Sequence, residues 1–294
     1  MKKLEGVVPP MVTPFASDGS LDEYNLTKLV HFLSEHVHGL FICGSYGNGP
    51  LMSVEEKKQV IELVAKNIPP TIQLVVHVGA TNVRDAVELA RHAEGAGAAK
   101  VSSVVPYYFH HTRESITLYF ERLVKAVKIP VYTYNNPKFT GIAIDVPLLQ
   151  ELANLGVAGV KDSSFDIMTL ANFARQIKNP DFDVVLGTEA MFLYAATIGV
   201  RAFIPGLGNA FPELCVDLYE AATQFEMEQA RTLQMRVNEL RDIMYLAKST
   251  VVAVYALLKI RGVCDAYPRE PFIALSEKET AAMRQQLVKA GFID

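Results

Sequence analysis

Lys161 is the residue of this 294-residue chain best suited to covalent chemistry. It follows the apolar run "LGVAGV", so its stem leaves a predicted strand from apolar surroundings. A charged ammonium is poorly solvated there, which lowers the pKa of a lysine, and the neutral amine forms Schiff bases with ketones. A lysine at a strand end can also extend its ammonium into water, and Lys161 alone does not exclude that simpler interpretation.

Tyr134 is the second candidate. Strand side chains alternate, so Tyr132 and Tyr134 share one face of "VYTYN", and Lys161 and Ser163 share one face of "VKDS". If the two runs are adjacent strands, Tyr134 lies beside Lys161 and can pass protons during imine formation and C–C cleavage. A packed tyrosine whose hydroxyl is bonded elsewhere is the alternative.

The stretch "GSYGNGP", from Gly44 to Pro50, is a glycine-rich turn that follows the apolar run "GLFIC". Such a turn can hold an anion on its backbone N–H groups. Its order is G-x-x-G-x-G, and it lacks the lysine and hydroxyl of a P-loop, so a phosphate-binding barrel enzyme is the weaker alternative.

Charge and composition narrow the partners. A net charge of −4 gives no basic field for nucleic acid, which favours a small metabolite. Cys43, Cys215 and Cys264 form no C-x-x-C pair, and His110 and His111 are adjacent, so we expect no metal site. No apolar run is long enough to span a membrane, and we expect a cytoplasmic protein without a membrane partner.

Eight short apolar runs alternate with segments of helical periodicity. The runs begin near Gly6, Gly39, Gln73, Lys100, Ile129, Val157, Asp183 and Arg201. This rhythm predicts an α/β fold, a (β/α)8 TIM barrel rather than an open doubly wound sheet. We expect a barrel domain over 1–211, then the last barrel helix and a C-terminal helical extension over 212–294. In a barrel the chemistry lies at the carboxyl ends of the strands.

Four motifs at those ends carry a family resemblance. They are "GSYGN", "PYY" from Pro106, "YNNPKFTG" from Tyr134 and "GVKDS" from Gly159. Over nearly its whole length the chain resembles the pyruvate-dependent class I aldolases that include dihydrodipicolinate synthase and N-acetylneuraminate lyase.

The resemblance implies roles for single residues. Lys161 would be the Schiff-base lysine, Tyr134 the general acid and base, and Ser45 a proton relay hydrogen-bonded to it. Tyr108 would reach a neighbouring subunit's site in a homotetramer built as a dimer of dimers. The N–H groups of Ser45 and Tyr46 would hold the carboxylate of pyruvate. The imine on Lys161 would replace any metal or organic cofactor.

Further positions are implied to contact the substrate. They are Tyr46, Gly47, Asn48, Phe139, Ser163, Gly187, Glu189, Ile204 and Gly206. Several depart from the best-known members: Phe139 replaces the arginine that grips a carboxylate in dihydrodipicolinate synthase, Gly206 replaces a serine of N-acetylneuraminate lyase, and Asn48 replaces the glutamate of the family turn.

The expected function is reversible cleavage of a 2-keto acid, in particular a 2-keto-3-deoxy sugar acid, into pyruvate and an aldehyde. A 2-keto-3-deoxy acid dehydratase and an N-acetylneuraminate lyase are alternatives, and dihydrodipicolinate synthase is disfavoured by Phe139. An inactive pyruvate sensor, suggested by Asn48 and Phe139, and the phosphate-binding barrel enzyme lie outside the class.

Overall fold

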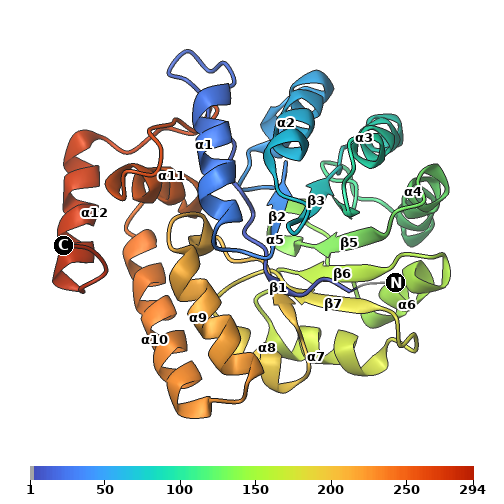
Figure 1. Ribbon diagram of the computed structural model, residues 1–294. Coiled ribbons are helices and arrows are strands. Elements are labelled where there is room, and N and C mark those ends of the chain that lie inside the picture. Colours follow the sequence, from blue (N-terminus) through green and yellow to red (C-terminus); the bar gives the residue numbers. More distant parts are fainter. Residues whose placement is uncertain (1–2) are drawn as a thin grey trace.

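A sheet of eight parallel strands forms the centre of the computed structural model, which describes residues 3–294 (Figure 1). The strands are β1 Gly6–Val7, β2 Gly39–Ile42, β3 Gln73–His77, β4 Lys100–Val104, β5 Val131–Asn135, β6 Gly159–Asp162, β7 Asp183–Leu186 and β8 Ala202–Phe203. They neighbour one another in the order β1-β8-β7-β6-β5-β4-β3-β2. All eight predicted strands are therefore present, and the predicted TIM barrel is confirmed.

The segment after β1 closes the barrel against β2. The His38 N–H donates to the Val7 carbonyl at 3.0 Å, and the Phe41 N–H donates to the Pro9 carbonyl at 3.0 Å. The predicted strand ran from Gly6 to Val12, whereas the regular ladder of β1 ends at Val7. Pro9 and Pro10 have no N–H to donate, so a regular strand cannot continue through them. Pro9 contributes to the contact with β2 only as an acceptor, through its carbonyl oxygen.

Helices follow the first seven strands. They are α1 Glu23–Ser34, α2 Val54–Asn67, α3 Val83–Gly95, α4 Arg113–Ala126, α5 Pro137–Thr140, α6 Val146–Asn154, α7 Ile167–Gln176 and α8 Phe192–Thr197. Most of them cover the outside of the barrel, and the short α5 lies at its rim (Figure 1). The capping box predicted at Ser53 and Glu56 starts α2, and Thr112 caps α4 by accepting from the Ser115 N–H. Each main helix buries one apolar stripe, as Leu26, Leu29 and Leu33 do on α1.

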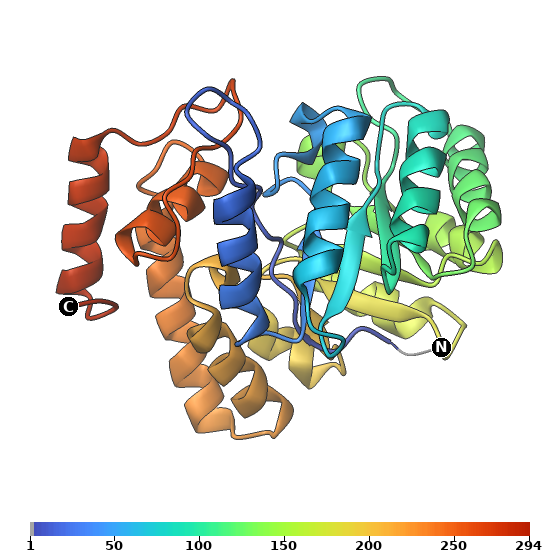
Figure 2. The same ribbon diagram turned by 45° about the horizontal axis from the view of Figure 1, so that its top comes forward.

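Four α-helices follow β8, after a short 3-10 helix at Leu207–Asn209. They are α9 Pro212–Thr223, α10 Met227–Met244, α11 Thr250–Ile260 and α12 Glu277–Lys289. Figures 1 and 2 both show α10, α11 and α12 gathered on one side of the barrel, with α12 outermost. Helix α11 is buried along nearly its whole length, which explains its uniformly apolar sequence. Among residues 3–294, no helix is both long and apolar enough to cross a membrane.

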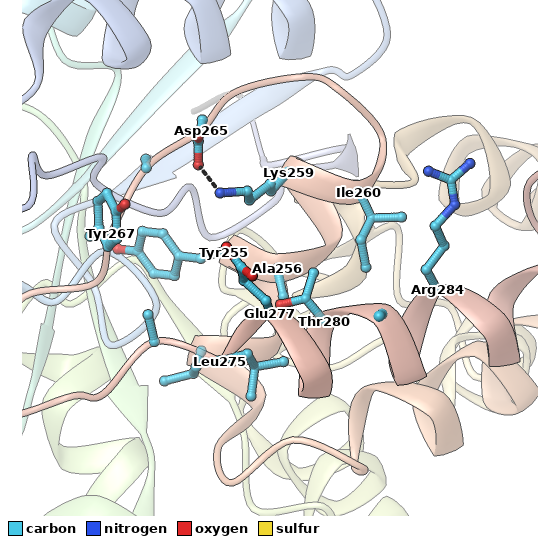
Figure 3. Close-up of a pocket in the computed structure, with 14 residues that line it drawn as sticks. Tyr255, Ala256, Lys259, Ile260, Asp265, Tyr267, Leu275, Glu277, Thr280 and Arg284 are labelled. Carbon is cyan, nitrogen blue, oxygen red and sulfur yellow. Dashed lines mark ion pairs between the residues drawn. The ribbon is translucent and has the colours of Figure 1, made fainter.

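The C-terminal helices enclose a cavity of their own, about 370 Å³, between α11, α12 and the segment that joins them (Figure 3). Lys259 on its wall is paired with Asp265 at 2.9 Å. Tyr255 belongs to this wall, but its hydroxyl donates to the Thr13 carbonyl at 2.8 Å. Helix α11 is thereby tied to the loop that follows β1, at the mouth of the barrel.

Candidate active site

Lys161 and Tyr134 lie side by side inside the barrel. They are register partners on β6 and β5, and the Lys161 Nζ atom is 3.8 Å from the centroid of the Tyr134 ring. Phe41 from β2 covers the same amine, with its ring centroid 4.1 Å away. Only 3% of Lys161 is exposed. The predicted adjacency of the two residues is thus confirmed, and the lysine does not extend into water.

Burial between the two rings lowers the pKa of Lys161, and the neighbouring Tyr134 phenol opposes this shift less strongly. A larger share of the amine is therefore neutral near physiological pH than in an exposed lysine. Because only the neutral amine attacks a carbonyl carbon, the location prepares Lys161 to act as a nucleophile.

The Tyr134 hydroxyl accepts a hydrogen bond from the Asn136 side-chain amide at 3.0 Å. The relay expected from Ser45 does not make this bond: within residues 3–294, no hydrogen bond joins Ser45 to Tyr134. Sequence reasoning missed Asn136. The available signal was its position two residues after Tyr134, at the carboxyl end of the same strand.

His77 stands at the end of β3 with its ring centroid 5.9 Å from that of Tyr134. Its Nε2 atom accepts from the Val104 N–H at 3.3 Å, so the histidine is satisfied, as a core residue would be. Burial, with the charges of Lys57 and Lys161, lowers the pKa of His77 to about 3. His77 therefore faces the site as a neutral side chain.

The glycine-rich turn presents free backbone donors. Within the described part of the chain, neither the Ser45 nor the Tyr46 N–H donates to another group. The turn is packed closely against the segment that follows β1: a Cβ added at Gly47 would lie only 2.9 Å from the Met11 carbonyl oxygen. A carboxylate can bind to such a pair of N–H groups, which is the use the sequence suggested.

Asn48 supports this turn from the C-terminal side. Its backbone adopts a left-handed conformation with φ of 54°, which asparagine tolerates better than most residues. Its side-chain oxygen accepts from the Arg269 N–H at 2.9 Å and from the Tyr255 hydroxyl at 3.3 Å. Asn48 is therefore a buried acceptor that ties the turn to α11 and to the chain that follows it.

Tyr108 lies at the surface, 87% exposed, and has a left-handed φ of 82°. Its ring contacts Phe109, with the centroids 5.0 Å apart. The preceding Tyr107, not Tyr108, lines the cavity beside Tyr134. Within one chain, Tyr108 is thus not brought to Lys161.

Glu189 is committed to contacts within the protein. Its Oε2 atom accepts from the Gly206 N–H at 2.8 Å, and its Oε1 atom is paired with the buried Arg241. Arg241 also donates to the Tyr245 hydroxyl at 2.6 Å. Sequence reasoning missed Arg241, because it lies on α10, far along the chain from the strand ends.

Ser163 and Gly206 are also enclosed. The Ser163 hydroxyl donates to the Gly187 carbonyl at 3.3 Å. A Cβ added at Gly206 would lie 2.6 Å from the Tyr46 hydroxyl oxygen, so Tyr46 fills the space that a side chain at 206 would need. Next to it, Ile204 belongs to the apolar interior of the barrel.

Phe139 is 62% exposed and lies on the short helix α5 at the rim. The neighbouring Lys138 amine is 5.9 Å from its ring centroid. Phe139 lines the cavity beside Tyr134, and Lys138 does not. No set of three His, Cys, Asp or Glu side chains within residues 3–294 converges as a metal site would require.

Comparison with known proteins gives one consistent result. Residues 3–290 match the dihydrodipicolinate synthetase family. The 4-hydroxy-tetrahydrodipicolinate synthase of Methanopyrus kandleri is 30% identical over 295 residues, 99% of this chain and 98% of the relative. The N-acetylneuraminate lyase of Mediterraneibacter gnavus is 30% identical over 290 residues, 97% of this chain and 92% of the relative.

A solved structure extends the likeness to three dimensions. YagE, a prophage protein of E. coli K12 crystallised in complex with pyruvate, has a TM-score of 0.94 at 25% identity, covering 99% of each chain. The chain therefore belongs to the dihydrodipicolinate synthetase family, whose members are lyases of the class I aldolase type that use a covalent lysine–pyruvate Schiff base and no external cofactor.

Proposed function

We propose that this protein reversibly cleaves a 2-keto acid into pyruvate and an aldehyde, with Lys161 as the Schiff-base residue. The observation that carries the proposal is the position of the Lys161 amine, buried and 3.8 Å from the centroid of the Tyr134 ring. A nucleophile and a proton carrier must be this close for imine chemistry.

In the cleavage direction, the neutral Lys161 amine attacks C2 of the keto acid, and the carbinolamine loses water to give a protonated imine. Tyr134 then takes the proton of the C4 hydroxyl. The C3–C4 bond breaks, its electron pair moves into the enamine, and the aldehyde leaves. A proton returned to C3 gives the pyruvate imine, and water hydrolyses it to release pyruvate and the amine.

The turn and its neighbours supply orientation. The free N–H groups of Ser45 and Tyr46 bind the substrate carboxylate, which places C2 in reach of Lys161. The Asn136 amide holds the Tyr134 hydroxyl in one direction. The Ser45 hydroxyl, on the wall of the same cavity, relays protons between Tyr134 and solvent once substrate is bound.

We also propose that the working form is a homotetramer made of two dimers. The exposed aromatic pair Tyr108 and Phe109 supports it, because aromatic side chains are enriched at protein contact sites. In the dimer, Tyr108 would enter the partner's site and complete the proton path. Sedimentation of the purified protein, compared with Tyr108→Ala, tests the assembly and the role of this residue.

In the reverse reaction, pyruvate adds to the aldehyde, and the product of that addition is the substrate for cleavage. C3 comes from the methyl group of pyruvate and carries no hydroxyl, so the substrate is a 2-keto-3-deoxy acid, and a sugar acid is the example expected from the sequence. The same imine can instead lose the C4 hydroxyl after C3 is deprotonated, which is the dehydratase alternative. Mass spectrometry separates the two outcomes, since only cleavage releases pyruvate and an aldehyde.

The deciding experiment is reduction with borohydride in the presence of pyruvate. We expect a stable pyruvyl adduct on Lys161, located by peptide mass spectrometry. Lys161→Ala should abolish the adduct, while Lys57→Ala, which removes another buried lysine, should retain it. Absence of an adduct on Lys161 in the unmodified protein would overturn the proposal. An adduct without turnover of any aldehyde would identify a pyruvate sensor instead.

A further inference from the structure

A cavity of about 450 Å³ lies beside Tyr134 at the mouth of the barrel. Much of its wall consists of apolar side chains, from Leu51, Val104, Phe139, Val251 and Phe272. Within residues 3–294, no lysine, arginine, aspartate or glutamate lines it. Whatever extends from the reacting carbons into this space therefore meets apolar contacts and no charge.

The polar side chains of the wall are largely used by the protein itself. Asn136 donates to the Tyr134 hydroxyl, and Thr140 donates to a backbone carbonyl at 3.1 Å. The side-chain oxygen of Asn48 accepts from a backbone N–H at 2.9 Å, and His77 accepts from another at 3.3 Å. These groups hold the loops in place, so they offer a ligand few further hydrogen bonds.

Two hydroxyls on the wall have no hydrogen-bond partner within the described chain, those of Ser45 and Tyr107. Ser45 stands on the turn that receives the pyruvate carboxylate. Tyr107 and the Asn136 side-chain oxygen, which accepts no bond within the described chain, are then left for the second substrate, and together they can satisfy the donor and acceptor of one hydroxyl. A chain with several hydroxyls needs more partners than this wall provides.

The positions where a sugar chain would be bound are also closed. Glu189 is paired with Arg241 and accepts from the Gly206 N–H. The Tyr46 ring covers Gly206, and Ser163 donates to a backbone carbonyl. Glu189, Gly206 and Ser163 thus make contacts within the protein and are not free to bind the hydroxyls of a sugar chain.

We propose that the aldehyde partner has an apolar body, aliphatic or aromatic, with no charged group and at most one hydroxyl. This inference rests on the proposed pyruvate chemistry at Lys161 and narrows it, in place of the sugar chain expected from the sequence. The reason lies in the free energy of transfer from water. Burying an apolar body against this wall is favourable, whereas burying a hydroxyl without a hydrogen-bond partner is unfavourable.

The test uses the full-length protein in the condensation direction, with pyruvate as donor. The apolar acceptors are benzaldehyde and 3-methylbutanal, and the polar ones are glyceraldehyde and succinic semialdehyde. We expect kcat/KM to be larger for the apolar pair by about tenfold or more, the discrimination that one unpartnered buried hydroxyl gives. Equal or higher values for glyceraldehyde or succinic semialdehyde, or no turnover of either apolar aldehyde, would overturn the inference.

Borohydride trapping of pyruvate on the same sample separates the two proposals. Trapping on Lys161 together with a preference for polar aldehydes overturns only the apolar partner. Failure of trapping overturns the pyruvate chemistry itself.

A substitution gives a second, independent test. Phe139→Arg places a cation at the rim of the cavity, and we expect it to shift the ratio of kcat/KM toward succinic semialdehyde relative to benzaldehyde by about tenfold or more. Phe225→Arg is the matched control, because Phe225 is similarly exposed but lies between α9 and α10. An unchanged ratio in Phe139→Arg, with pyruvate trapping retained, would contradict the assignment of this wall to the aldehyde.

Discussion

The amine of Lys161 lies 3.8 Å from the centroid of the Tyr134 ring, and the two residues are register partners on adjacent parallel strands. The ladder between β5 and β6 fixes this relationship, since their backbones are hydrogen-bonded at these positions. Neither side chain depends on a flexible loop for its place. Nucleophile and proton carrier are therefore oriented before substrate arrives.

Tyr134→Phe should separate imine formation from turnover. Without the phenol hydroxyl, we expect kcat to fall by about two to four orders of magnitude, the usual contribution of a general acid and base. Borohydride should still trap pyruvate on Lys161, although more slowly. Thr133→Ser, at the preceding position of β5 and on its other face, serves as the control. Full activity in Tyr134→Phe would remove the tyrosine from the mechanism.

Lys161→Met should stabilise the fold at neutral pH. Burial lowers the pKa of Lys161 below that of the unfolded chain, so the unfolded state holds more protons and the contribution of this group to stability rises with pH. The cost of the buried ammonium disappears only above the unfolded pKa, about 10.4. The variant should thus have a higher Tm than the parent at pH near 7, with a gap that narrows toward pH 10.

The control for this comparison is Lys125→Met, which alters an exposed lysine paired with Glu121. Its Tm should change little at either pH, because exposed i,i+4 pairs contribute only about 0.3–0.5 kcal/mol. A Tm of Lys161→Met that equals or falls below that of the parent near neutral pH would show that the amine is not destabilised by burial.

Asn48→Ala should destabilise the glycine-rich turn. It leaves the Arg269 N–H without its acceptor, which costs about 1–3 kcal/mol for an unsatisfied buried group. The Tyr255 hydroxyl keeps its shorter bond to the Thr13 carbonyl. Alanine also pays about 1–2 kcal/mol to keep the left-handed backbone at this position. Chemical denaturation measures the loss, and pyruvate trapping should weaken with it.

Asn48→Gly separates the lost hydrogen bonding from the backbone strain, because glycine adopts the left-handed backbone without cost but lacks the side-chain amide. Its loss of stability should be smaller than that of alanine and still measurable. Asn154→Ala, at an exposed position at the end of α6, should be close to neutral. If Asn48→Gly matched the parent in stability, the hydrogen bonds of Asn48 would not support the turn.

Glu189→Gln should be among the more damaging single changes outside the catalytic pair. It removes the charge that neutralises the buried Arg241, and breaking one side of a buried ion pair costs about 3–5 kcal/mol. The double variant Glu189→Gln with Arg241→Met should recover much of that loss, because no buried charge is left unpaired. Denaturant titration of the single and double variants measures both values. If the double variant were no more stable than Glu189→Gln alone, Glu189 and Arg241 would not be energetically coupled.

Much of the fold could be predicted because its signals are local. Short apolar runs mark the strands, and Ser53 with Glu56 marks the start of α2 within four consecutive residues. The seam beyond Val7 was predicted less well, since two prolines interrupt donation within an otherwise strand-like run. Alternation along β5 and β6 predicted Tyr134 beside Lys161 on the condition that the two strands are adjacent, and the register of the sheet meets that condition.

The sequence by itself determined the barrel, the strand that carries Lys161 and the glycine-rich turn after the second strand, because these follow from periodicity and from residue types within a few positions of one another. The burial of the Lys161 amine was decided by the tertiary structure. Only the tertiary structure decided which groups remain free for a substrate. The bond from Arg269 to Asn48 joins residues 221 positions apart, and Arg241 reaches Glu189 from 52 positions away. Such pairings depend on how distant segments pack around the closed barrel, and they leave the wall beside Tyr134 apolar.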